Sequence, residues 1–325
     1  MIKRIACLSA CLGLTIAAGA SEASAASTGP AIRVPTSKLQ AAVQCRGNLA
    51  QAQKAPVLLI PGTFGSGQIN WGWNYQKLLP TLGHPACTVT FPADGAGDIQ
   101  ASTPYAVWAI RMMAQRSGRK VVVIGHSQGG LEARWALRWW PDTRSDVSQV
   151  ITLAAPNGGA LYPDQHCSAP DSCAASLYQM RSSSNFLKTL NHGRNLTWGI
   201  PWTAIGTTSD TVFVLPPQAS LRGAQNFTVQ ELCPDHQVGH VNLAYDGPAS
   251  AIVLHALRHN GHVRLSSISR SVCNAPLMRG VTQAKVNAVL AQYNTILAKA
   301  LGPDGPRAQS EPPLACYVTG SCRKK

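Results

Sequence analysis

The sequence predicts an α/β fold in which helices cover both faces of a mostly parallel, doubly wound sheet. Short apolar runs alternate along the chain with longer segments of helical spacing, and glycine- or proline-rich turns separate them. Of the 325 residues, 45% are hydrophobic and only 13% are charged, which suits a sizeable core. Neither an internal repeat nor a linker divides the chain, so we expect one domain over residues 26–325.

Five apolar or β-branched runs predict the strands of this sheet. Each is short, and turn residues bound most of them, as is typical of buried strands. In chain order they cover residues 56–60, 87–91, 121–124, 149–154 and 202–206.

Apolar residues at helical spacing predict the helices between and after these strands. They cover residues 35–40, 102–117, 128–140, 248–258 and 281–301, and Pro141 ends the third. Residues 160–200 break the alternation, and we expect them to form a cap or lid over the site. The proline-rich, basic residues 302–325 form a C-terminal extension.

The first 25 residues have the pattern of a secretory signal peptide. Two basic residues precede an apolar stretch that ends near Ala20, and residues 23–25 (Ala-Ser-Ala) suit cleavage near Ala25. A lipobox-like run at 8–11 lies too early for lipidation. No later run is long and apolar enough to span a membrane. We therefore expect a secreted, soluble protein.

Eight cysteines remain after the signal peptide, and an even number in an exported chain implies disulfides. Two pairs, 167/173 and 316/322, are six residues apart and close local loops, and the other four most simply pair as 45–87 and 233–273. The chain has no Cys-x-x-Cys motif, so we expect no metal and no cofactor. The eight are Cys45, Cys87, Cys167, Cys173, Cys233, Cys273, Cys316 and Cys322.

The formal net charge is +14, but the basic residues are scattered along the sequence rather than arranged in a stripe. This distribution favours a solvated basic surface over a nucleic-acid site. We expect no nucleic-acid partner, a monomer, and at most a lipid–water interface as a further contact.

The strand at 121–124 leads into the most informative motif, Gly125-His126-Ser127-Gln128-Gly129, from which a helix leaves. Strand, G-x-S-x-G turn and helix together form the nucleophile elbow of an α/β-hydrolase fold, with the Ser127 hydroxyl exposed at the apex. The flanking glycines leave the space that so tight a turn needs. We therefore assign Ser127 as the nucleophile.

A serine nucleophile needs a base, and in this fold the acid and the histidine follow the serine in that order. Of the later acids only Asp210 lies in a turn directly after a predicted strand, although a turn-capping role also fits it; Glu132 suits an ordinary helix position. The candidates are Glu132, Asp142, Asp146, Asp164, Asp171, Asp210, Glu231 and Asp235.

Two histidines compete for the role of base. His240 follows a glycine in a loop before a predicted helix, which favours it on geometry, and His236 remains the alternative. His126 adjoins the nucleophile on a sharp turn, so we interpret it as pocket lining.

The tetrahedral oxyanion needs backbone N–H donors. We expect one from Gln128, at a helix N-terminus, and one from Thr63 in the glycine-rich loop 61–67, where the threonine hydroxyl is a further donor. Several apolar residues near these loops suit either an acyl site or the core: Phe64, Trp71, Trp73, Val212 and Val214.

Taken together, these motifs resemble the Candida antarctica lipase B family over about residues 36–322. The residues that carry the resemblance are Val57-Leu-Leu-Ile-Pro-Gly-Thr63, Ser127-Gln-Gly-Gly-Leu131 with Trp139-Trp-Pro, Ser209-Asp210 and His240. The resemblance implies an α/β-hydrolase with a Ser127–Asp210–His240 triad, a Thr63/Gln128 oxyanion hole, and hydrolysis of carboxylic esters, including triacylglycerols, without a cofactor. The 45–87 and 233–273 disulfides and a bridge near the C-terminus also fit that family.

The chain departs from the family pattern at several points. Phe64 stands where a small residue is usual, and His126 replaces a tryptophan. The segment between Cys167 and Cys173 has no counterpart, and the loop with the histidine is a residue shorter, which keeps His236 open as the base.

The sequence thus predicts a secreted lipase that acts on triacylglycerol-type esters through an acyl-enzyme on Ser127. A short-chain esterase or polyester depolymerase of the same mechanism is the nearest alternative. The alternative of another class is a non-catalytic lipid- or polymer-binding protein.

Overall fold

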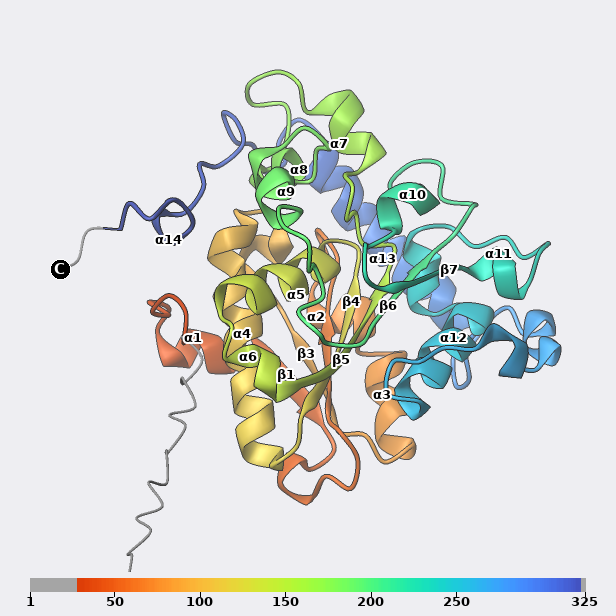
Figure 1. Ribbon diagram of the computed structural model, residues 1–325. Coiled ribbons are helices and arrows are strands. Elements are labelled where there is room, and N and C mark those ends of the chain that lie inside the picture. The colour runs from red at the N-terminus through yellow and green to blue at the C-terminus, as the bar shows by residue number, and fades with distance from the viewer. Residues whose placement is uncertain (1–27, 323–325) are drawn as a thin grey trace, which may run out of the picture.

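A seven-stranded sheet forms the centre of the protein in the computed structural model, which describes residues 28–322 (Figure 1). Only the first strand of the sheet is antiparallel to its neighbour; the other five pairings are parallel. Across the sheet the order is β1 (Val43–Arg46), β3 (Ala86–Val89), β2 (Val57–Ile60), β4 (Val121–His126), β5 (Val147–Leu153), β6 (Trp202–Gly206) and β7 (Gln225–Thr228). The doubly wound α/β prediction is confirmed.

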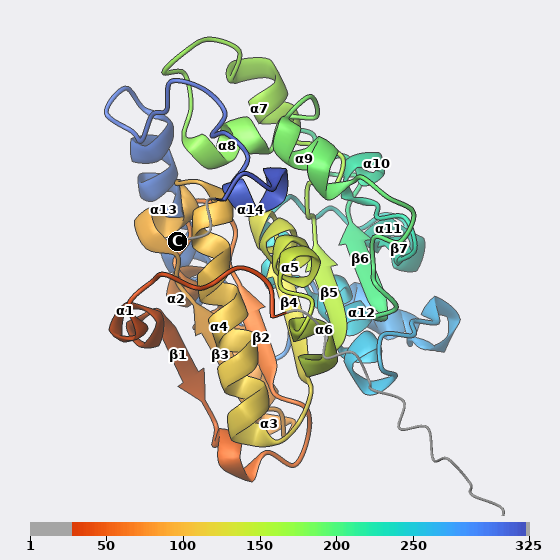
Figure 2. The ribbon, with the colours of Figure 1, turned by 60° about the vertical axis from the view of Figure 1, so that its left-hand side comes forward.

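The longer helices cover the two faces of this sheet (Figure 2). Helices α4 (Ile99–Ser117) and α5 (Gln128–Trp139) pack on one face, and α3 (Tyr75–Thr81) and α12 (Gly247–Arg258) pack on the other. The shorter α1 (Thr36–Ala41) and α6 (Thr143–Asp146) contact α4 at its periphery.

Strand alternation produces two separate hydrophobic cores. In β2, Leu58 and Ile60 contribute to the core beneath α4 and α5, whereas Val57 and Leu59 contribute to the core beneath α3 and α12. All four side chains are fully buried. A parallel strand buried on both faces therefore appears in the sequence as a continuous apolar run.

The edge strands β1 and β7 were not predicted. Only one residue of β1 is even half-buried, and β7 reads Gln-Asn-Phe-Thr without a buried position. An edge strand has one neighbour and little core contact, so neither segment shows the apolar run or the alternation that indicates a strand. The five predicted strands and five predicted helices are present, with ends that differ by a few residues.

Residues 160–200, predicted as a cap, fold into three short helices, α7 (Leu161–His166), α8 (Ala175–Gln179) and α9 (Asn185–Leu190). They lie at the end of the sheet where the parallel strands terminate, beside the last long helix, α13 (Gln283–Leu301) (Figure 2). The remaining short helices are α2 (Gly67–Trp71), α10 (Pro216–Ala219), α11 (Val229–Leu232) and α14 (Cys316–Thr319).

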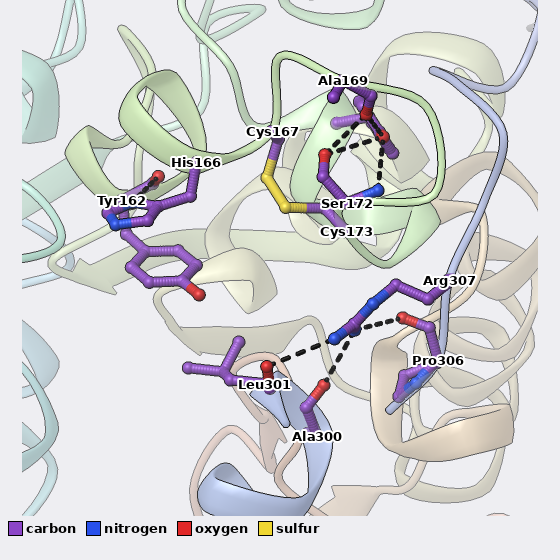
Figure 3. Close-up of a disulfide and its surroundings, with 11 residues drawn as sticks. Tyr162, His166, Cys167, Ala169, Ser172, Cys173, Ala300, Leu301, Pro306 and Arg307 are labelled. Atoms are coloured by element: carbon purple, nitrogen blue, oxygen red, sulfur yellow. Dashed lines mark hydrogen bonds between the residues drawn. A yellow bond between two sulfur atoms is a disulfide. The ribbon is translucent and has the colours of Figure 1, made fainter. Parts of the chain in front are cut away.

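The C-terminal extension joins α13 to the segment 160–200 that holds α7, α8 and α9. Arg307 donates hydrogen bonds to the carbonyl oxygens of Ala300 and Leu301 at the end of α13 (Figure 3). Ala308 forms a β-bridge with Cys173. The Glu311 carboxylate accepts from the first two backbone N–H groups of α9. Residues 300–311 are thereby held against residues 173–186, which are distant in sequence.

Four disulfides join the pairs 45–87, 167–173, 233–273 and 316–322 that the sequence suggested. The first connects directly opposite residues of β1 and β3. None of the helices that the structure describes has the length and apolar character needed to cross a bilayer. The predicted signal peptide at 1–25 lies outside the described residues.

Removal of different disulfides should cost different amounts of stability. Cys45–Cys87 closes 42 residues and Cys316–Cys322 only 6, so chain entropy predicts losses of about 4 and about 2 kcal/mol. Urea unfolding of Cys45→Ala/Cys87→Ala, with Cys316→Ala/Cys322→Ala as the matched control, measures both. Equal losses would contradict this entropic account.

Candidate active site

Ser127 lies at a strained turn between β4 and α5. Its φ of 52° and ψ of −125° are unusual for a residue with a side chain. A Cβ on Gly125 would lie 2.6 Å from the Gly129 carbonyl carbon, and one on Gly129 would lie 2.4 Å from the Ile60 oxygen. The backbone therefore requires both glycines. The Ser127 N–H donates to the Leu153 oxygen at 2.8 Å, which ties the turn to β5.

Asp210 follows β6 and pairs with His240, whose Nδ1 lies 2.6 Å from Asp210 Oδ2. The carboxylate is 2% exposed and also accepts from the Phe213 and Val214 N–H groups, both at 2.9 Å. Burial opposes ionisation, but the hydrogen bond and charge of His240, with these amides, lower the pKa of Asp210 overall. Asp210 is therefore an anion positioned to orient the imidazole.

His236, the alternative base, has a different partner. Its Nε2 lies 2.5 Å from Oδ2 of Asp246, the residue whose other oxygen caps α12 through the Ala249 N–H. The structure therefore pairs His240, and not His236, with Asp210.

Ser127 and His240 line one cleft of about 540 Å³, part of which is open to solvent. Among residues 28–322 the Ser127 hydroxyl has no hydrogen-bond partner. Bonds between nucleophile and base are often long without a substrate and tighten when one binds. The cleft thus holds a free hydroxyl and an oriented imidazole.

The predicted oxyanion residues, Thr63 and Gln128, meet beside the nucleophile. The Thr63 hydroxyl donates to Gln128 Oε1 at 2.7 Å, and within the described chain neither backbone N–H has a protein acceptor. Gln128 begins α5, where the helix dipole favours an anion. Two free N–H groups next to Ser127 are what a developing oxyanion requires.

Glu132, predicted as an ordinary helix residue, lies on α5 but is fully buried. Its carboxyl accepts from Ser102 Oγ at 2.6 Å and Thr103 Oγ1 at 2.7 Å. Burial raises the pKa of Glu132 to about 7, although its hydrogen bonds oppose the rise. The one sequence signal for a contact between Glu132 and Gln128 was their i, i+4 spacing, because residues four apart lie on the same side of a helix.

His126 is buried and lines the cleft, as predicted. Its Nε2 lies 3.0 Å from the backbone oxygen of His240, and its Nδ1 lies 3.2 Å from Oδ1 of Asn70, which accepts from the Gly62 N–H. Burial lowers the pKa of His126 to about 3, so the ring is neutral. A neutral imidazole has one N–H, so only one of these two contacts to an oxygen is a hydrogen bond. His126 lies between the loop with the base and the loop with Thr63.

The sequence assigned five apolar residues to either the acyl site or the core. Of these, Phe64 and Val214 line the cleft. Trp71 and Trp73 belong to the core beneath α3 and α12, and Val212 is 54% exposed. Further apolar walls come from Tyr162, Leu177 and Met180 in the segment 160–200, which was predicted to cover the site. Others come from Tyr293, Leu297 and Leu301 of α13, whose position no motif indicated.

Known proteins resemble this chain in sequence. Lipase B of Pseudozyma antarctica is 28% identical over 300 residues, which are 89% of this chain and 86% of that protein. A triacylglycerol lipase of Pseudomonas fragi is 28% identical over 112 residues, or 34% of this chain and 37% of its own. A family model described as a PGAP1-like alpha/beta domain matches residues 97–187.

Solved structures agree with these sequence relatives. The crystal structure of lipase B from Aspergillus fumigatus has a TM-score of 0.79 and 25% identity, covering 90% of this chain and 73% of that chain. The mature form of a Bacillus licheniformis lipase has a TM-score of 0.53 and 15% identity, covering 67% and 97%, and supports the fold alone.

The stability of the protein should depend on pH through Glu132. Its pKa in the folded state, about 7, exceeds the ordinary 4.5, so the native state binds the proton more tightly and stability falls as pH rises from about 4.5 through 7. The glutamine of Glu132→Gln does not titrate. The difference in melting temperature between this variant and wild type should therefore shift in favour of the variant as the pH is raised from 5 to 8.5. Glu231→Gln, at an exposed helix cap, controls for the loss of a glutamate. A pH-independent difference between Glu132→Gln and wild type would contradict the elevated pKa.

Proposed function

We propose that this chain, a member of the lipase B-like family of α/β-hydrolases, hydrolyses carboxylic esters with Ser127 as nucleophile, His240 as base and Asp210 as the acid that orients it. One observation carries the assignment: the buried Asp210–His240 pair opens on the same cleft as the strained, unpaired Ser127. The lipase relatives support this enzyme class.

The proposed reaction is acyl transfer in two halves. His240 Nε2 takes the Ser127 proton as the hydroxyl oxygen attacks the ester carbonyl, and the Thr63 and Gln128 N–H groups stabilise the oxyanion. Collapse of the intermediate breaks the bond to the alcohol, which leaves with the proton from His240. Water then attacks the acyl-enzyme by the same route and releases the acid.

The walls of the cleft support an apolar substrate. Leu177, Met180, Leu297 and Leu301 have no polar side-chain atom, so they suit an alkyl chain rather than a charged or sugar-like group. Together with the relatives, a lipase B and a triacylglycerol lipase, this favours triacylglycerol-type esters.

One observation favours the short-chain esterase or polyester depolymerase as the alternative. Val212 is the one large hydrophobic side chain that is exposed among residues 28–322. The strongly exposed surface therefore offers few large apolar side chains with which to hold the protein at an oil–water interface.

The four disulfides suggest an oxidising, extracytoplasmic location. We further propose that the signal peptide is removed near Ala25 and that the mature enzyme is secreted as a monomer.

Ser127→Ala should lower kcat on nitrophenyl esters from C2 to C16 by on the order of 10⁴- to 10⁶-fold, because no other group replaces the nucleophile. A fluorophosphonate should label wild type but not the variant, and an unchanged melting temperature is the control. Preference for medium or long chains supports a lipase, and restriction to short chains supports the esterase alternative. Turnover by the variant would refute the nucleophile, and an inactive wild type would favour a binding protein.

His240→Gln and His236→Gln form a matched pair of tests. Loss of the base should reduce kcat/KM by several orders of magnitude, as with other members of a triad. His236→Gln should stay within a few-fold of wild type, because His236 pairs with Asp246 outside the cleft. The opposite ranking would make His236 the base.

A further inference from the structure

The buried carboxyl of Glu132 lies one helical turn after Gln128 and has no place in the two-step reaction. We propose that Glu132 is a positioning residue for the oxyanion hole: its carboxyl fixes the side chain of Gln128, and that side chain in turn fixes Thr63. The proposal rests on the proposed function, since it concerns the same oxyanion.

The contacts of Gln128 determine which way its amide faces. The Nε2 group donates to the Gly95 oxygen at 3.0 Å and to Glu132 Oε1 at 3.3 Å, two groups that accept these hydrogens. A flipped amide would place its oxygen against both acceptors. The Gln128 oxygen must therefore face the Thr63 hydroxyl, from which it accepts at 2.7 Å.

Glu132 is itself held on both oxygens. Ser102 Oγ donates to Oε1 and Thr103 Oγ1 donates to Oε2, and both hydroxyls come from the beginning of α4. The carboxyl is thus fixed to a second helix and presents Oε1 to Gln128 in one orientation.

On the side away from Glu132, the Gln128 amide packs against the loop that contains Gly95. Gly95 has a φ of +78°, and a Cβ there would lie 3.2 Å from Gln128 Nε2, so the loop backbone packs directly on the amide. Gly95 and Glu132 therefore enclose Nε2 between them, which restricts the side chain to the conformation that reaches Thr63.

Stability alone gives no reason for a carboxyl at this position. Well-packed apolar replacements of buried ionisable groups are often neutral or stabilising. Without Glu132, the Ser102 and Thr103 hydroxyls still have the Ile99 oxygen within 3.1 and 2.8 Å, and Gln128 keeps the Gly95 oxygen. What is lost is the second acceptor that orients Gln128.

This arrangement also assigns the Thr63 hydroxyl. A hydroxyl has one hydrogen, and that of Thr63 is donated to Gln128. Thr63 therefore serves the oxyanion through its backbone N–H, while its side chain holds the loop against α5. In this structure the hydroxyl, which was expected as a further oxyanion donor, is engaged with Gln128.

Glu132→Leu and Glu132→Gln test the proposal through ester kinetics. The leucine variant removes the acceptor and should lower kcat about tenfold with KM within about twofold, a smaller effect than loss of an oxyanion donor itself. The glutamine variant retains an acceptor oxygen and should recover kcat to within about threefold of wild type. Melting temperature and fluorophosphonate labelling confirm a folded site, and Glu132→Met replaces the leucine variant if that variant does not fold.

A double-mutant cycle with Thr63→Val tests the route of the effect. If Glu132 acts through Gln128 on Thr63, the two losses in kcat should not multiply in Glu132→Leu/Thr63→Val. A folded leucine variant with wild-type kcat, or losses that multiply fully, would overturn the proposal. An inactive wild type would instead overturn the proposed function, so the two failures are distinguishable.

Discussion

The close approach of the first turn of α5 to the end of β2 is the constraint on which the rest of the site depends. Gly129 packs against the Ile60 oxygen, two residues after the strained Ser127. The same approach places the N-terminus of α5 beside the loop that holds Thr63. A single backbone contact thus exposes the hydroxyl and aligns the helix dipole with the two free N–H groups.

Three buried acids near the site show how local environment sets their roles. Asp210 faces an imidazole and several backbone amides, and its pKa is lowered, which suits a permanent anion. Burial dominates for Asp246 and raises its pKa even though it pairs with His236 and caps a helix. Glu132 faces mostly hydroxyls, which interact with either protonation state. Residue type alone does not distinguish these three environments.

The central strands and the turn after β4 were predictable because buried parallel strands and the nucleophile elbow impose local patterns on the sequence. Asp210 was predictable from its place after β6. The choice of His240 over His236 was not certain, because it depends on which carboxylate each ring meets in space. The contribution of α13 to the cleft and the role of Glu132 depend on contacts between distant helices, for which a single sequence has no local signal.

The attachment of the C-terminal extension has a consequence for the shape of the cleft. One wall of the cleft comes from Tyr293, Leu297 and Leu301, and the extension beyond them secures the end of α13 and the start of α9 through Arg307 and Glu311. Closure of the cleft on this side therefore depends on residues 293–311, whereas the elbow, Asp210 and His240 come from residues 125–240. The reactive groups and this apolar wall are thus contributed by separate parts of the chain.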